Sequence, residues 1–259
     1  MNAQHGLHMV TEGDGEPLVL LHGWGMHSGI WNGFTDELAK FFKVIKVDLP
    51  GHGNSARDCP LTLQETAMQL LEQLPPKAHY IGWSLGGSIL MHLGGIAPER
   101  IRSMVLMTAN PCFVQQEQWP MAMQADVLQE FSDALKQNYR KTLLRFIALQ
   151  TVSSERSKLS LKHLRESLFS LEDPDQLALQ QGLDILLQAD LRQVFIDTKI
   201  PGLILLGERD QLVPVSVADF YRSANEHCIV KIIPAAGHVP FISHQSQTLT
   251  EVKGFLENV

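Results

Sequence analysis

Short apolar runs, each followed by residues typical of turns, recur along most of the chain. A continuous apolar run, unlike an alternating one, is typical of a strand that is covered on both faces of a parallel sheet. We therefore expect a buried, mostly parallel sheet. The runs that predict its strands are residues 18–21, 44–47, 79–81, 104–107, 203–206 and 229–233.

Helix-compatible segments lie between several of these runs. An alternation of strands and helices is typical of an α/β sheet with helices on both faces. The chain then closes with a further helical pattern over residues 247–256. The earlier segments that predict flanking helices are residues 29–41, 62–74, 86–97 and 216–223.

One region, residues 112–190, contains no clear strand run. Its apolar residues follow the three-and-four spacing of amphipathic helices, which predicts one helix through residues 128–147 and another through 161–171. We interpret 112–190 as a helical cap inserted into an α/β core of residues 1–111 and 191–259. The alternative is that these helices belong to the core itself.

Composition narrows the class of protein. The chain has 259 residues, 44% of them hydrophobic and 19% charged, an ordinary balance for one large domain or a domain with an inserted cap. No run approaches about 18 apolar residues, as a membrane span requires, and the start lacks the layout of a secretory signal. A formal net charge of −7 argues against general nucleic-acid binding. Three widely spaced cysteines suit a reducing compartment and match no metal pattern. We expect a cytoplasmic protein with no metal, membrane or nucleic-acid partner.

A serine lies between glycines in the sequence Gly82-Trp83-Ser84-Leu85-Gly86. An apolar run precedes this segment and a helical pattern follows it. In that context the G-x-S-x-G pattern makes a strained turn that exposes a serine hydroxyl as a nucleophile. We therefore expect Ser84 to be the nucleophile of a hydrolase. The alternative is a plain Gly/Ser-rich turn, which could have the same sequence.

A serine nucleophile needs a histidine base that is oriented by a carboxylate, in the chain order Ser, acid, His. Asp210 follows the apolar run 203–206, and His238 follows the run 229–233. The carboxyl ends of parallel strands are where such folds place active residues. We assign Asp210 and His238 as the acid and the base, with Glu208 and His244 as the alternatives.

The negative charge that develops on an attacked ester needs two backbone N–H donors. The residue after the nucleophile, Leu85, supplies one, and the loop after an earlier strand supplies another. That loop is His22-Gly23-Trp24-Gly25, and we assign Trp24 as its donor. We expect His22 to have a structural role and to bond within its loop. The glycine-rich segment 47–55, VDLPGHGNS, is also expected to be structural.

Taken in order, the motifs HGWG, DLPGHGNS, GWSLGG, GERD and AAGH resemble the α/β-hydrolase family along essentially the full chain. The segments PERI, RFIALQT and HVPFISH are similar to those of family esterases that act on acyl chains held by acyl carrier protein. The resemblance implies a cofactor-free carboxylesterase that cleaves the methyl ester of pimeloyl-[acyl-carrier protein] in biotin biosynthesis. It also implies substrate contacts by the following residues: Trp24, Ser84, Leu85, Phe146, Ile147, Ala148, Leu149, Gln150 and His238.

The cap segment is basic, in contrast with the whole chain. Between residues 136 and 165 there are eight basic residues and one acidic residue, Glu155. The family resemblance implies an acidic carrier, which a basic surface would attract. The residues that we expect to dock the carrier are Arg140, Lys141, Arg145, Arg156, Lys158, Lys162 and Arg165. The alternatives are a solvated helix face without a partner, and a promiscuous short-chain carboxylesterase that acts on small esters only.

Overall fold

The computed structural model describes residues 6–56, 62–151 and 157–259. Seven strands form one sheet in the order β1-β3-β2-β4-β5-β6-β7, in which β1 is antiparallel to β3 and every other neighbouring pair is parallel. This arrangement confirms the expected α/β-hydrolase fold class. The strands are β1 (Met9–Glu12), β2 (Glu16–Leu21), β3 (Phe42–Val47), β4 (Ala78–Trp83), β5 (Ile101–Met107), β6 (Gly202–Gly207) and β7 (Cys228–Ile233).

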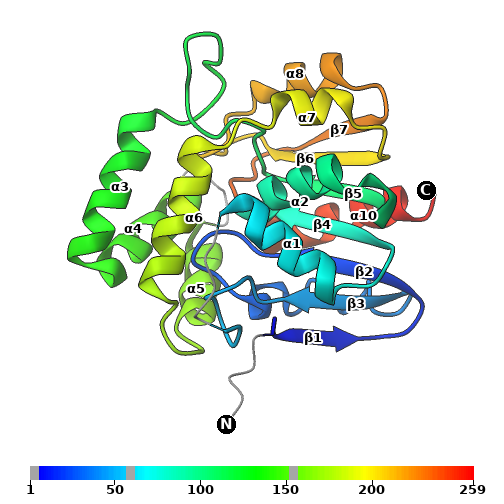
Figure 1. Ribbon diagram of the computed structural model, residues 1–259, viewed down its shortest axis with the longest axis horizontal. Helices are drawn as coiled ribbons and strands as arrows, with labels where there is room; N and C mark the ends of the chain where they lie inside the picture. The colour runs from blue at the N-terminus through cyan, green and yellow to red at the C-terminus, as the bar shows by residue number, and fades with distance from the viewer. Residues whose placement is uncertain (1–5, 57–61, 152–156) are drawn as a thin grey trace.

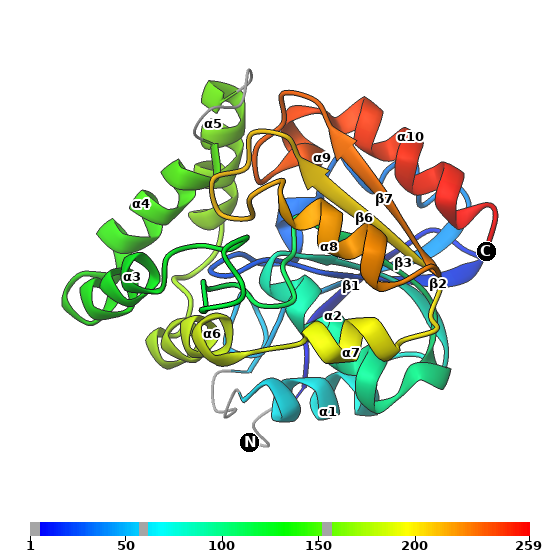
Figure 2. The same cartoon turned by 90° about the horizontal axis from the view of Figure 1, so that it is seen from above.

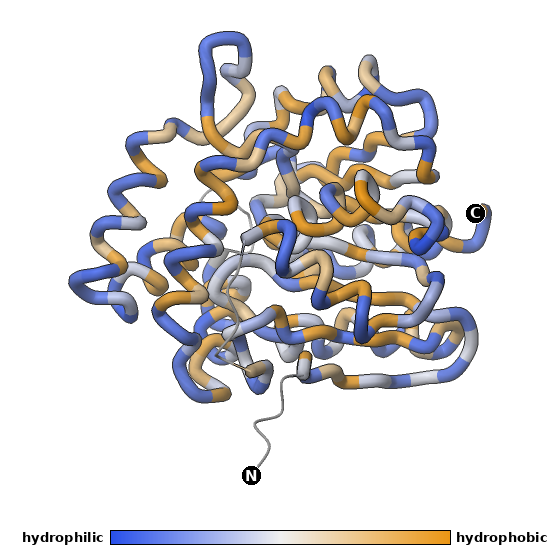
Figure 3. The backbone as a smooth tube through the Cα atoms, viewed as in Figure 1, coloured by the Kyte–Doolittle hydropathy of each residue, from blue (hydrophilic) through white to orange (hydrophobic). Residues whose placement is uncertain are grey.

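Helices cover both faces of the sheet. Figure 2 shows α1, α2 and α7 on one face and α9 and α10 on the other. Six apolar runs predicted β2 to β7, and Figure 3 shows how hydrophobic residues concentrate along the strands in the middle of the molecule. The core helices are α1 (Leu63–Gln73), α2 (Leu85–Ile96), α7 (Arg192–Asp197), α8 (Val217–Ala224), α9 (Pro240–Ser243) and α10 (Gln245–Leu256), with two 3-10 turns, η1 (Ser28–Trp31) and η2 (Pro98–Arg100).

Four further helices stand beside the carboxyl ends of the parallel strands (Figure 1). They are α3 (Ala125–Gln137), α4 (Tyr139–Thr151), α5 (Ser157–Leu168) and α6 (Gln176–Gln188). The chain leaves the core after β5 and returns before α7, and the two crossings lie side by side. Cys112 forms an antiparallel bridge with Asp190, and the Leu191 N–H donates to the Pro111 carbonyl at 2.7 Å. The boundaries of the cap at 112 and 190 stay a prediction.

Two expected helices differ from the structure. The single helix predicted through residues 128–147 is two helices, α3 and α4, which are separated at Asn138. Segment 29–41 forms only the short turn η1 followed by further turns, because Gly33 adopts a φ of +81°, which a continuing helix cannot contain. The helix predicted at 62–74 is present, and Thr62 caps it through a reciprocal bond with Glu65.

The described part of the chain has no helix long and apolar enough to span a membrane. Two cysteines, Cys112 and Cys228, are free thiols, and Cys59 lies outside the described residues.

Candidate active site

Ser84 occupies the turn between β4 and α2. Its backbone adopts φ 53° and ψ −116°, a region that residues with a side chain rarely enter. The Ser84 N–H donates to the Met107 carbonyl at the end of β5 (3.0 Å), and the residue as a whole is only 2% exposed. The G-x-S-x-G segment therefore forms the strained strand–turn–helix that its sequence predicts.

The two glycines of this motif are required by close backbone contacts. A Cβ on Gly86 would lie 2.3 Å from the Leu21 carbonyl oxygen, and one on Gly82 would lie 2.5 Å from the Gly86 carbonyl oxygen. These distances are well below van der Waals contact. The spacing of the motif thus follows from how tightly α2 begins against β2 and β4.

Asp210 and His238 come together from the loops after β6 and β7. His238 Nδ1 lies 2.7 Å from Asp210 Oδ2, and both side chains are buried. The other carboxylate oxygen accepts the N–H groups of Leu212 and Val213 at 2.8 and 3.0 Å. Because a carboxylate only accepts, Nδ1 of the histidine carries the ring proton and Nε2 of the neutral ring is free to accept one. That Nε2 is buried and makes no hydrogen bond within the described residues.

The backbone of His238 is fixed beside the serine turn by three bonds. Its carbonyl accepts the Trp83 indole N–H and the Thr108 hydroxyl, both at 2.9 Å. Trp83 directly precedes Ser84, and Thr108 directly follows β5. The His238 N–H donates to the carbonyl of Gln150 at the end of α4 (3.2 Å). These contacts hold the His238 backbone at the ends of β4 and β5, and among the described residues the Ser84 hydroxyl makes no hydrogen bond with the His238 ring.

The two alternative residues have other partners. The carboxylate of Glu208 is exposed and accepts the Ala235 N–H at 2.7 Å. His244 Nδ1 lies 2.9 Å from the hydroxyl of its neighbour Ser243. The structure therefore pairs Asp210 with His238, and it brings neither Glu208 nor His244 into that pair.

Trp24 sits in a four-residue turn that the Met26 N–H closes onto the Gly23 carbonyl (3.3 Å). Gly25 in this turn has a φ of +74°, and a Cβ there would lie 2.7 Å from Leu143 of α4. Leu85 is the first residue of α2, so its N–H has no partner within the helix. Of the two residues assigned to the oxyanion hole, Leu85 thus directly follows Ser84 at the start of α2, and Trp24 lies in the turn after β2.

Helices α6 and α4 contact Trp24 directly. The indole N–H of Trp24 donates to the Leu179 carbonyl of α6 at 2.7 Å, and the Phe146 ring of α4 meets the indole edge-on with centroids 4.8 Å apart. Phe146, Ile147 and Gln150 are buried, whereas Ala148 and Leu149 are partly exposed. Helical geometry puts Ala148 on the side of α4 opposite to Phe146. Within the predicted segment 146–150, Phe146 packs on Trp24 and the Gln150 carbonyl accepts the His238 N–H.

The basic residues assigned to carrier docking divide into two groups. Arg140 pairs with Asp173 at 3.2 Å and Lys162 with Glu166 at 3.7 Å, so their charges are partly compensated. Arg156 lies outside the described residues. The exposed residues that form no ion pair with another described residue are Lys141, Arg145, Lys158 and Arg165.

His22 and the segment 47–55 have the structural roles that the sequence predicts, and the structure adds a bond between them. The His22 Nδ1 lies 2.8 Å from the Gly23 carbonyl, as expected, and its Nε2 accepts the Leu49 N–H at 2.9 Å. Burial, followed by the nearby His52, lowers the pKa of His22 to about 3. Burial opposes ionisation of Asp48, but N–H donors from Asn54 and Ser28 outweigh it and lower the pKa of that carboxyl. Near neutral pH, the His22 ring is therefore neutral and the Asp48 carboxyl is ionised.

Two residues that hold the histidine carbonyl, Trp83 and Thr108, were not assigned from the sequence. Trp83 occupies the unspecified position before the serine, where any residue satisfies the motif. Thr108 follows an apolar run and has a φ of 42°, and no pattern marks it. Each acts through a contact between segments more than a hundred residues apart, which local spacing does not reveal.

Comparison with known proteins defines the class first. The family model described as alpha/beta hydrolase fold matches residues 16–245. This chain belongs to the α/β-hydrolase family, and it is a hydrolase of carboxylic esters. Among solved structures, an esterase from Exiguobacterium antarcticum is similar with a TM-score of 0.86 at 22% identity, covering 97% of this chain and 96% of that one. A bromoperoxidase from Bacillus anthracis has a TM-score of 0.87 at 21% identity, covering 97% and 95%.

More similar relatives narrow the comparison to one kind of esterase. A protein of Nitrosomonas europaea named pimeloyl-[acyl-carrier protein] methyl ester esterase is 38% identical over 242 residues, which cover 93% of this chain and 96% of that protein. A protein of the same name from Methylococcus capsulatus is 38% identical over 251 residues, covering 97% and 98%. The resemblance that the sequence motifs suggested is thereby confirmed.

Proposed function

We propose that this chain hydrolyses the methyl ester of pimeloyl-[acyl-carrier protein], releasing methanol and the free pimeloyl carboxylate on its carrier, as a step of biotin biosynthesis in the cytoplasm. Ser84 is the nucleophile, His238 the base and Asp210 the residue that orients the base. The observation that carries the chemistry is the buried His238–Asp210 pair. The Nε2 of His238 has no partner among the described residues, and the His238 carbonyl is bonded to Trp83, the residue before Ser84. The names of full-length relatives support the substrate.

The acylation step follows from this arrangement. His238 Nε2 takes the proton of the Ser84 hydroxyl while Ser84 Oγ attacks the ester carbonyl. The imidazolium that forms is stabilised by the Asp210 carboxylate at 2.7 Å. When the tetrahedral intermediate collapses, the bond to the methoxy group breaks and the imidazolium gives its proton to the departing methanol. The product of this step is an acyl-serine.

The N–H groups of Leu85 and Trp24 bind the oxygen that becomes negative during attack. One donor of this kind contributes about 3 kcal/mol to transition-state stabilisation. Water then attacks the acyl-serine with His238 as base, which restores Ser84 and frees the carboxylate. The chain's own residues supply every proton transfer in this sequence.

The exposed cations of α4 and α5 support an acidic macromolecular substrate. Lys141 and Arg145 are one turn apart on α4, and Lys158 and Arg165 lie on the neighbouring helix α5. The same helix α4 carries Phe146 and Gln150 on its inner side, against the oxyanion loop and His238. A carrier bound to this surface would therefore present its acyl chain next to the catalytic residues.

Mass spectrometry of the reaction products tests the proposal. The protein is incubated with carrier protein loaded with pimeloyl methyl ester, and a panel of free short-chain esters is run beside it. We expect the loaded carrier to lose the mass of one methylene as methanol appears, and Ser84→Ala to leave the carrier unchanged while folding normally. Turnover of free esters with no change in the loaded carrier would favour the promiscuous carboxylesterase. Residual turnover by Ser84→Ala would refute the assignment of the nucleophile.

A further inference from the structure

His22 contacts two backbone groups, and these contacts define its protonation. The Leu49 N–H donates to His22 Nε2 at 2.9 Å, so this nitrogen carries no proton. In a neutral ring the proton is then on Nδ1, which lies 2.8 Å from the Gly23 carbonyl oxygen and donates to it. The ring is fully buried, so water does not compete for either bond.

The carbonyl that His22 holds belongs to the same peptide unit as the N–H of Trp24. In a planar trans peptide, the C=O and the N–H point in opposite directions. Holding the Gly23 oxygen toward the imidazole therefore turns the Trp24 N–H away from it. The Met26 N–H also reaches this oxygen, but at 3.3 Å it is the longer of the two bonds.

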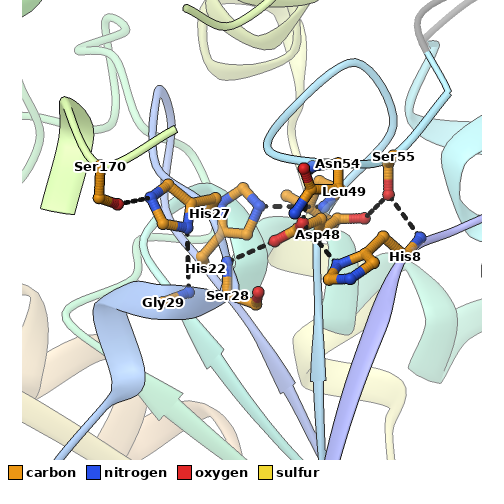
Figure 4. Close-up of polar contacts among 10 residues, drawn as sticks. All are labelled: His8, His22, His27, Ser28, Gly29, Asp48, Leu49, Asn54, Ser55 and Ser170. Carbon is orange, nitrogen blue, oxygen red and sulfur yellow. Dashed lines mark hydrogen bonds and ion pairs between the residues drawn. The ribbon is translucent and has the colours of Figure 1, made fainter. Parts of the chain in front are cut away.

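The other end of the imidazole is anchored on a rigid part of the core. Leu49 directly follows Asp48, whose side chain is completely buried and accepts the N–H groups of Ser28 (2.6 Å) and Asn54 (2.9 Å). His8 Nδ1 also lies 2.9 Å from this carboxylate. Figure 4 shows these bonds meeting at Asp48, with His22 reaching toward Leu49 beside it. The anchor of His22 is thus held by three separate segments of the chain.

We propose that His22 is a positioning residue for the oxyanion hole, which links the Leu49 N–H to the Gly23 carbonyl and so aims the Trp24 N–H at the reacting ester. The proposal rests on the proposed function, because it assumes that Trp24 donates to the oxyanion. It assigns to His22 an effect on the rate of the chemical step and not on the binding of the ester.

Two substitutions separate the two bonds. The amide nitrogen of Asn in His22→Asn occupies the place of Nδ1 and keeps a donor for Gly23. The amide of Gln in His22→Gln reaches the place of Nε2 and keeps an acceptor for Leu49. On a small chromogenic ester we expect His22→Gln to lose about 10²-fold in kcat with KM nearly unchanged, as for the loss of an oxyanion donor. His22→Asn should be at least about tenfold more active than His22→Gln.

Affinity for a trifluoromethyl ketone, which forms a tetrahedral adduct with the serine, provides the second readout. It should fall in parallel with kcat across wild type, His22→Asn and His22→Gln, while thermal stability falls similarly in both variants. Equal losses of kcat in the two variants, or losses that follow stability and not ketone affinity, would overturn the proposal. Ester hydrolysis that proceeds normally in wild type but survives Ser84→Ala would instead contradict the proposed function.

A measurement on the wild-type protein does not depend on any variant folding. Nitrogen NMR of the protein labelled in its histidines reports which ring nitrogen carries the proton. We expect His22 to be neutral with the proton on Nδ1 between about pH 5 and 8. A proton on Nε2 would exclude the bond from Leu49 and overturn the proposal.

Discussion

At the scale of single residues, Asp210 serves two purposes with its two oxygens. One oxygen fixes the loop after β6 by accepting the Leu212 and Val213 N–H groups, and the other orients His238. The sequence could indicate that an acid follows this strand, because the position after a buried run is recognisable. It favoured Asp210 and left Glu208 as the alternative, since the final choice depends on which carboxylate turns inward.

Replacement of Asp210 by Asn should separate folding from catalysis. The amide oxygen can still accept the Leu212 and Val213 N–H groups, which leaves the amide N–H₂ facing His238. A donor in that place makes Nδ1 an acceptor and moves the ring proton to Nε2, where it blocks proton transfer from Ser84. We expect Asp210→Asn to reduce kcat by about 10⁴-fold in a steady-state assay. Calorimetry should show a melting temperature close to that of wild type, and a kcat within tenfold of wild type, by the same principle, would contradict the assigned role.

The low pKa of His22 predicts that the protein loses stability in acid. Burial, followed by His52, lowers this pKa to about 3, whereas an unfolded histidine titrates near 6.5. Between these values the unfolded chain binds a proton that the folded chain does not, so the free energy of unfolding falls as the pH decreases. Burial lowers the pKa of His52 in the same direction.

Chemical denaturation at a series of pH values measures this effect. The stability contributed by neutral His22 is fully present above about pH 6.5 and is lost progressively toward pH 3, at about 1 kcal/mol per pH unit. Wild type should therefore lose stability steadily from pH 6 to 4, and His22→Asn should have a shallower slope in that range. Equal slopes for the two proteins would show that His22 titrates normally in the folded state.

At the scale of elements, the seam between α2 and the neighbouring strands is the tightest constraint around the serine turn. Gly86 leaves no space for a Cβ, because the Leu21 and His22 carbonyl oxygens would lie 2.3 and 2.7 Å away. Both obstacles are backbone atoms that cannot rotate aside. A methyl group at Gly86 must therefore push α2 away from β2 or displace the loop that follows β2.

A matched pair of glycine substitutions tests this constraint. Gly86→Ala should destabilise the fold by about 3 kcal/mol, the upper part of the usual range for overpacking, and should lower kcat because Leu85 moves with the helix. Gly254→Ala in α10 is the control, since a Cβ there meets nothing within 4 Å. In a helix interior this change should stabilise by about 0.5–1 kcal/mol. Denaturant unfolding measures both, and a Gly86→Ala protein as stable as wild type would contradict the packing argument.

Two features were not predicted from the sequence: the break between α3 and α4, and strand β1. Leu135, Tyr139 and Leu143 continue a spacing of four across Asn138, so the apolar stripe does not reveal that α3 ends and α4 begins there. Strand β1 reads Met-Val-Thr-Glu and lies at the sheet edge, mostly half-buried, so it has no apolar run. The buried central strands, by contrast, were apparent because both of their faces are covered.

At the scale of the whole molecule, charge is unevenly distributed. The chain has a formal net charge of −7, yet α4 and α5 present Lys141, Arg145, Lys158 and Arg165 without compensating ion pairs among the described residues. The sequence predicted this basic surface from the excess of basic over acidic residues between positions 136 and 165. It could not predict that Arg140 pairs with Asp173, 33 residues further on, whereas the pair of Lys162 with Glu166 lies within α5 at a spacing of four residues.

Charge reversal tests whether this surface serves a carrier. Lys141→Glu combined with Arg145→Glu should reduce kcat/KM for the carrier-bound ester by about tenfold or more and leave a small ester unaffected. Lys77→Glu with Lys199→Glu is the matched control, because both residues are exposed and precede β4 and β6, at the end of the sheet away from the cap. The wild-type preference for the carrier should also weaken with added salt. Equal effects of the two double variants would argue against docking at α4 and α5.

The bridge between Cys112 and Asp190, with the Leu191–Pro111 bond beside it, brings the two ends of segment 112–190 together. Because the excursion starts and finishes at adjacent points, the intervening segment can be lengthened, shortened or swapped without re-threading any strand. We therefore expect that substrate preference can be changed by hybrid proteins. In these hybrids the core would be joined, at these two positions, to the corresponding segment of another family member. Such grafts would keep Ser84, Asp210 and His238, and they would have to provide again the carbonyl groups of Gln150 and Leu179, which bond His238 and Trp24.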